Sequence, residues 1–99
     1  YVNDPLVFHG KTPARLAAEM LKAMMRVTAE VDKIALPFVV IQGGADKIID
    51  PAGAQMLYDR ASSKDKTLKV YDGLCHEVHN EPSCATMFQE LEVWLDAHI

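Results

Sequence analysis

The sequence has no long hydrophobic run, no cluster of basic residues and few cysteines. Its longest apolar stretch falls far short of the roughly 20 residues that a membrane-spanning helix needs. Its formal net charge is −4, with acidic and basic residues interleaved. An acidic balance without a basic patch argues against a nucleic-acid partner. We therefore expect a cytoplasmic protein with no membrane span and no nucleic-acid ligand.

The chain contains only two cysteines, Cys75 and Cys84, with His76 and His79 between them. Structural zinc sites usually have paired ligands at short spacing, and Cys-His-x-x-His followed by a distant cysteine lacks that arrangement. Disulfides are typical of secreted chains, and no secretory feature is present. We expect two free, partly buried thiols and no metal site.

The chain is also short: 99 residues make at most one small domain. With 49% hydrophobic and 24% charged residues, it has the composition of an ordinary globular protein. It opens at Tyr1 without a signal-like start, which favours a fragment or a processed piece.

The apolar run Phe38–Ile41 leads into Gly43, Gly44 and then Asp46. A short apolar run without alternation is typical of a strand buried on both faces, as in parallel sheets. The glycines end the strand, so Asp46 lies just past its carboxyl end, where ligands and catalytic groups collect in open α/β sheets. The simpler interpretation is that Asp46 only caps a turn.

Three helices and a second strand are predicted around this strand. The first helix begins at Thr12-Pro13 and ends near Asp32. Its apolar face repeats at helical spacing: Leu16, Met20, Met24 or Ala23, Val27 and Val31. Met20, Met24 and Met25 are interpreted as core residues, or alternatively as an adaptable wall for an apolar substrate.

The second helix follows Asp50-Pro51, and alternation over 67–71 predicts a strand after it. The inner face of that helix is formed by Ala54, Leu57, Tyr58 and Ala61. Pro82 and Ser83 open the last helix, with Met87, Phe88, Leu91, Trp94 and Leu95 directed inward. Strand, helix, strand forms a βαβ unit with parallel strands. The fold class is therefore α/β: a helix, then strand-helix-strand, then a C-terminal helix, in three α/β/α layers.

His76 follows the second strand as Asp46 follows the first, so both should lie at one edge of the sheet. A carboxylate bonded to one imidazole nitrogen leaves the other free to act as a base. Acid before histidine is the order that closes the α/β-hydrolase triad. The nucleophile is missing, since no serine stands in Gly-x-Ser-x-Gly. The serines are Ser62, Ser63 and Ser83.

Several segments in order resemble the C-terminal third of the monoglyceride lipase and lysophospholipase branch of the α/β-hydrolases. These segments are Asn3–Val7, Pro37-Phe38, Gln42–Asp46, Asp65–Gly73 and His76–Glu81. The resemblance implies that residues 1–99 form the C-terminal portion of a single α/β-hydrolase domain. The nucleophile elbow, the oxyanion hole and the lid would then lie upstream of Tyr1. One departure is Cys75, where relatives often carry an aromatic residue.

By resemblance, Asp46 is the catalytic acid and His76, rather than His79, the base. Ile48 and Ile49 either line the acyl pocket or simply pack in the core. His9 and His98 are interpreted as surface residues. The implied function is a serine hydrolase of carboxylic esters such as monoacylglycerols or lysophospholipids, which needs no cofactor. An upstream lid would bring it into peripheral contact with membranes.

Two alternatives remain open at this point. One is a non-catalytic fragment or interaction module, and the other is an esterase for phenolic esters of the caffeoyl-shikimate type. In either case two strands leave a sheet edge unpaired. We expect that edge to be covered by the upstream part of the hydrolase, or by a second copy through oligomerisation or swapping.

Overall fold

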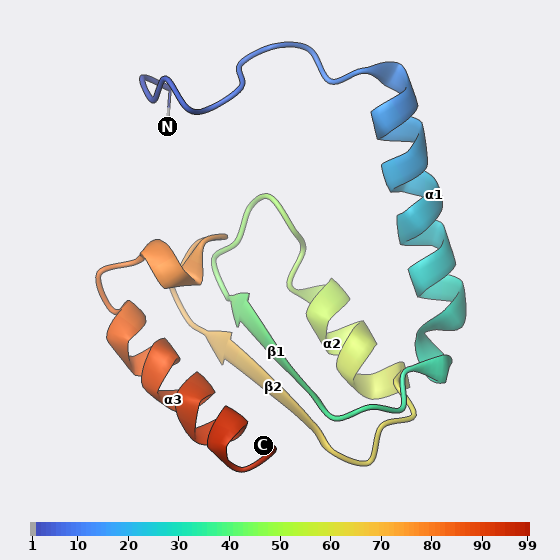
Figure 1. The fold of residues 1–99 in the computed structure, drawn as a ribbon, viewed down its shortest axis with the longest axis vertical. Helices are drawn as coiled ribbons and strands as arrows, with labels where there is room; N and C mark the ends of the chain where they lie inside the picture. Colours follow the sequence, from blue (N-terminus) through green and yellow to red (C-terminus); the bar gives the residue numbers. More distant parts are fainter. Residues whose placement is uncertain (1) are drawn as a thin grey trace. The chain divides into compact units, whose positions relative to one another are not determined.

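The computed structural model describes residues 2–99, which separate into two compact units, one ending at Glu30 and the other spanning Val31–Ile99. In the first unit, α1 spans Ala14–Glu30 and begins directly after Pro13, as predicted (Figure 1). None of its residues is buried, and Leu16, Met20 and Met24 are about half exposed. The prediction that its methionines pack in a core is therefore wrong for these residues.

The second unit begins with the 3₁₀ turn η1 (Val31–Lys33), which ends one residue past Asp32, where the first helix was expected to end. Val31 is the most deeply buried large side chain of the described residues, at 1% exposed. Of the residues predicted on the apolar face of the first helix, Val31 alone reaches a core. The other buried apolar side chains come from elements on both faces of the sheet: Ala54, Ala61, Val78 and Met87.

A βαβ unit forms the centre of this second unit. Strands β1 (Phe38–Gly43) and β2 (Lys66–Tyr71) are parallel, in a register that runs from Phe38 opposite Lys66 to Gly43 opposite Tyr71. Helix α2 (Ala52–Arg60) connects them, and the Asp50 carboxylate accepts a hydrogen bond of 2.9 Å from the Ala52 N–H at its start. Both strands end at the same edge of the sheet (Figure 1). The predicted parallel pairing is confirmed.

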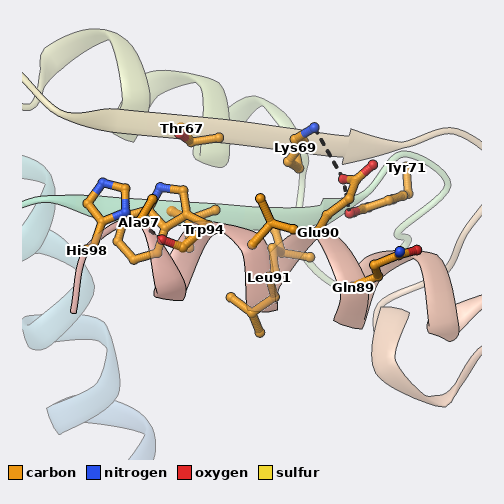
Figure 2. A pocket seen from close by; sticks show the side chains of 12 residues that line it. Thr67, Lys69, Tyr71, Gln89, Glu90, Leu91, Trp94, Ala97 and His98 are labelled. Carbon is orange, nitrogen blue, oxygen red and sulfur yellow. Dashed lines mark hydrogen bonds and ion pairs between the residues drawn. The ribbon is translucent and has the colours of Figure 1, made fainter.

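Helices cover the two faces of the sheet. After β2 the chain forms the 3₁₀ turn η2 (Val78–Asn80) and helix α3 (Cys84–Asp96), which lies along the face that presents Lys69 and Tyr71 (Figure 2). On the other face, Lys66 reaches α2, where its ammonium donates to the Ala61 carbonyl at 2.7 Å. The predicted α/β/α layering is confirmed.

Burial differs from the prediction in two elements. In β1 every residue before Gly43 is only half-buried, because β2 is the only strand paired with it among residues 2–99. The expected burial on both faces is therefore not reached within this chain. On α3, Met87 is buried as predicted, whereas Phe88 and Leu95 are exposed. These two lie at the sides of the apolar stripe and not at its centre.

Candidate active site

The loops that follow β1 and β2 are joined by backbone hydrogen bonds. The N–H of Gly44 donates to the Tyr71 carbonyl at 2.9 Å, and the N–H of Ala45 donates to the Leu74 carbonyl at 2.9 Å. These bonds extend the parallel pairing past the ends of the strands. They hold the segment that carries Asp46 beside the segment that carries His76.

The carboxylate of Asp46 is almost completely enclosed, with 2% of its side chain exposed. Its Oδ1 accepts hydrogen bonds from the N–H groups of Ile48 (2.8 Å) and Ile49 (3.0 Å). Burial by itself raises the pKa of this carboxyl. Hydrogen bonds from Ile49, His76, Ile48 and Gln42 outweigh that effect and hold its pKa well below the ordinary value, so Asp46 is ionised at neutral pH.

His76 meets this carboxylate directly: its Nδ1 lies 2.8 Å from Asp46 Oδ2. An ionised carboxylate only accepts hydrogen bonds, so the proton between them belongs to Nδ1 and the lone pair of the neutral ring belongs to Nε2. The His76 side chain is 43% exposed, and its Nε2 has no hydrogen-bond partner within residues 2–99. The predicted hydrogen-bonded pair of Asp46 and His76 is confirmed. The pair presents one basic nitrogen to the outside.

The loop around His76 is fixed by Glu81, whose Oε1 accepts a hydrogen bond of 2.9 Å from the Cys75 N–H. Next to His76 lies a pocket of about 290 Å³. The residues lining it are mostly apolar: Ile41, Val78, Met87, Phe88 and Leu91, with His76 and His79. An imidazole therefore faces an apolar pocket that opens to the surface.

The other candidate residues, Ile48, Ile49 and His79, have different positions around the pair. Ile48 and Ile49 contact Asp46 through their backbone N–H groups, while their side chains are 74% and 46% exposed. Plain core packing of these two side chains is therefore wrong. His79 is exposed and lines the same pocket as His76 without a hydrogen bond to the pair.

Two polar residues at the site were not singled out by sequence reasoning. Gln42 donates from Nε2 to Asp46 Oδ2 at 3.0 Å, and Glu81 holds the His76 loop as described above. Gln42 is the single polar side chain in an otherwise apolar strand. A polar residue at the end of an apolar run is the sequence signal that could have identified Gln42. No comparable pattern marks Glu81, because its partner is a backbone N–H.

A larger cavity of about 450 Å³ lies away from the pair, between α3 and the sheet (Figure 2). At one end the Tyr71 hydroxyl donates to Glu90 Oε2 at 2.7 Å, and Lys69 Nζ lies 3.2 Å from the same oxygen. Burial and this contact with Glu90 raise the pKa of Tyr71 to about 12. At the other end His98 stacks on Trp94, with 3.8 Å between the ring centres. Tyr71 therefore stays protonated at neutral pH.

The described residues contain no group of three or more potential ligands placed to hold a metal ion. Both cysteines are free thiols. Cys84 is partly buried as expected, whereas Cys75 is exposed because its loop lies at the open edge of the sheet. None of the helices in residues 2–99 has both the length and the apolar character needed to cross a membrane.

Comparison with known proteins gives consistent matches. A family model described as "Serine aminopeptidase, S33" matches residues 1–83. A monoacylglycerol lipase from Mycolicibacterium smegmatis is 36% identical over the whole chain, which covers 35% of that protein. The human monoglyceride lipase is 36% identical over 96% of the chain, which covers 32% of it. A caffeoylshikimate esterase from Arabidopsis thaliana is 29% identical over 98% of the chain and is covered to 30%.

A solved structure agrees with these sequence matches. The crystal structure of a monoacylglycerol lipase from Paleococcus ferrophilus superposes with a TM-score of 0.90 and 30% identity, covering all of this chain and 38% of that one. The chain thus spans about a third of the length of the curated relatives it matches. With a family model matching 83 residues in sequence and a closely superposing fold, the chain belongs to the serine aminopeptidase S33 family of α/β-hydrolases.

Proposed function

We propose that this chain supplies the acid and the base of a serine ester hydrolase whose nucleophile lies in an upstream segment. The observation that carries the proposal is the Asp46–His76 hydrogen bond of 2.8 Å, with a buried carboxylate and an imidazole whose Nε2 is free. No serine within residues 2–99 bonds to His76, and Ser62 and Ser63 are both bonded elsewhere. The proposal therefore takes the nucleophile from outside these residues.

In the proposed mechanism, Nε2 of His76 takes the proton of the upstream serine while its oxygen attacks the ester carbonyl. The ionised Asp46 stabilises the imidazolium that results. His76 then gives this proton to the departing alcohol, leaving an acyl-enzyme. In the second half, His76 takes a proton from water, whose oxygen attacks the acyl carbonyl, and returns the proton to the serine.

The substrates we propose are lipid-like esters, such as monoacylglycerols or lysophospholipids. The apolar pocket beside His76 supports this, since it offers Ile41, Met87 and Leu91 to a hydrocarbon chain at the reacting imidazole. The exposed side chains of Ile48 and Ile49, next to Asp46, are proposed to line the acyl site together with upstream residues. We place the enzyme in the cytoplasm. Because such substrates lie in membranes, we propose that an upstream lid brings it into peripheral contact with lipid surfaces.

A second substrate class is phenolic esters, and the similarity to a caffeoylshikimate esterase favours it. The two classes differ in what enters the apolar pocket. A flexible acyl chain adapts to methionine and leucine side chains, whereas a phenylpropanoid acid needs a flat slot.

The test uses the full-length hydrolase that carries this chain, with a fluorophosphonate probe and a panel of esters. Covalent labelling, together with turnover of a monoacylglycerol above that of a caffeoyl ester, is the expected result. The reverse order of turnover would favour the phenolic esterase. Absence of labelling and of turnover would instead identify the chain as part of a non-catalytic module.

A further inference from the structure

One hydrogen bond of the Asp46 carboxylate comes from a side chain that has no part in the proposed proton transfer. Its Oδ1 accepts from the backbone of Ile48 and Ile49, and its Oδ2 accepts from His76. The remaining donor to Oδ2 is Nε2 of Gln42, at 3.0 Å. Gln42 belongs to β1, so this donor is anchored by the strand ladder instead of the loop.

The orientation of the Gln42 amide is determined by its partners. Its Nε2 also donates to the Gly43 carbonyl oxygen, at 3.1 Å. The Asp46 carboxylate and this carbonyl are both acceptors, so the nitrogen and not the oxygen of the amide must face them. A flipped amide would place Oε1 against two oxygens. The donor is therefore aimed at Oδ2 by the local chemistry.

We propose that Gln42 is a positioning residue of the Asp46–His76 pair, which holds Oδ2 in line with Nδ1 of the imidazole. The inference rests on the proposed function, since it assigns a role within the same acid–base pair. Without Gln42, His76 is the one described donor left on Oδ2, and the carboxylate can turn further about its Cβ–Cγ bond. That rotation takes Oδ2 away from the Nδ1 proton and leaves the imidazolium less stabilised in the transition state.

The test compares two substitutions of similar size in the full-length hydrolase, Gln42→Met and Gln42→Glu. The first removes the donor, and the second replaces it with an acceptor that repels Asp46 when ionised. Gln42→Met should lower kcat about 10- to 100-fold, the range for losing one hydrogen bond to a charged group. KM should stay unchanged, because Gln42 does not face the apolar pocket. Rates are taken per active site titrated with a fluorophosphonate.

Gln42→Glu adds a second measurement, the pH dependence of kcat, which a purely structural role of Gln42 would not change. Its kcat relative to the unsubstituted enzyme should be lowest at neutral pH and should recover as pH falls, because the introduced carboxyl then takes up a proton and can donate again. Asp46 and His76 are the titratable groups that share its hydrogen bonds, and Asp72 lies against Gly44 beside them. The relative kcat of Gln42→Met should not depend on pH.

The matched control is Gln55→Glu. Gln55 on α2 also donates its amide to an aspartate, Asp59, at 2.9 Å, but on the exposed surface and outside the site. The Gln55→Glu substitution makes the same change of charge as Gln42→Glu and breaks the same kind of hydrogen bond. Its kcat and pH profile should equal those of the unsubstituted enzyme.

Three outcomes would overturn the proposal: an unchanged kcat in Gln42→Met, an effect on KM alone, or a Gln42→Glu ratio that does not vary with pH. If neither variant folds, proton NMR of the unsubstituted enzyme decides. The Gln42 amide protons should exchange with solvent more slowly than those of exposed Gln89, and equal exchange would overturn the proposal. Asp46→Ala distinguishes failure of the Gln42 proposal from failure of the proposed function. If that variant keeps full turnover, the proposed function itself fails.

Discussion

The backbone of Gly43 lies directly against the carbonyl oxygen of Cys75. A Cβ at Gly43 would overlap this oxygen and would lie 2.6 Å from the Leu74 carbonyl oxygen. The residue at the end of β1 must therefore be glycine for the loop that carries His76 to approach. Gly43 is needed for this close approach, and its backbone conformation is one that any residue adopts.

Gly43→Ala should destabilise the protein by about 1–3 kcal/mol, the usual cost of overpacking a filled site. It should also lower ester turnover, because the neighbouring atoms are backbone and can move away only by shifting His76. Urea unfolding and kcat of the full-length hydrolase measure the two effects.

The control is Gly53→Ala on α2, where an added Cβ meets nothing within 4 Å. A helical Gly→Ala change of this kind should stabilise by about 0.5–1 kcal/mol and leave kcat unchanged. If the two alanine variants behaved alike, the close approach at Gly43 would have no consequence.

The proposed acid and base, Asp46 and His76, can be distinguished from their neighbour His79 by substitution. In the full-length hydrolase, His76→Ala and Asp46→Ala should each lower kcat by roughly 10⁴-fold, the scale known for loss of a triad acid. His79→Ala should cost far less, since His79 lines the pocket without contacting Asp46. A larger loss for His79→Ala would reverse the assignment of the base.

His98 ties the end of α3 to the loop before β2, and we expect it to make the stability depend on pH. Hydrogen bonds to the Trp94 carbonyl and then to Asp65 raise the pKa of His98, against the opposing effect of burial. Because the pKa of His98 is higher in the folded than in the unfolded protein, its contacts contribute fully to folding stability below the unfolded value of about 6.5. This contribution is lost as pH rises through the folded-state pKa. Urea unfolding at pH 5.5 and 8.5 should therefore show a larger destabilisation by His98→Gln at the lower pH.

Asp65→Asn should reduce the same pH dependence, because Asp65 Oδ2 lies 2.9 Å from His98 Nε2. Equal destabilisation by His98→Gln at the two pH values would show that this contact does not form in solution.

The sequence predicts most of what places the site. The apolar run before Gly43, the prolines at helix starts and the alternation over 67–71 are local signals, and each corresponds to an observed element. Because the two strands are parallel, the positions of Asp46 and His76 just after them are enough to predict the pair. The pair is a consequence of topology, which periodicity reveals.

What the sequence does not predict depends on contacts between distant segments. The sequence shows that Phe88 and Leu95 are apolar, but it does not show how far neighbouring elements cover their side chains. His98 was expected as a plain surface residue, yet it bonds to Asp65, which is 33 positions away. Glu81 also escapes notice, because a carboxylate that accepts a backbone N–H leaves no pattern in sequence.

The last prediction concerns residues 1–99 expressed alone. We expect this chain to be inert toward esters and either poorly stable or associated with further copies. Within residues 2–99, each strand of the two-stranded sheet has one edge without a partner. The face toward α3 also leaves a cavity of about 450 Å³ over Val39 and Ile41. Unpaired edges and uncovered apolar faces favour association or swapping.

The energetic scale supports this expectation. Burying a valine, isoleucine or phenylalanine side chain contributes about 1.5–3 kcal/mol. Partial cover over Phe38, Val39, Val40 and Ile41 therefore forfeits a large share of the roughly 5–15 kcal/mol by which a native domain is stable. Sedimentation, thermal melting and hydrolysis of a short nitrophenyl ester test the prediction. A monomer with a sharp melt would contradict the stability argument, and serine-dependent turnover would contradict the placement of the nucleophile upstream.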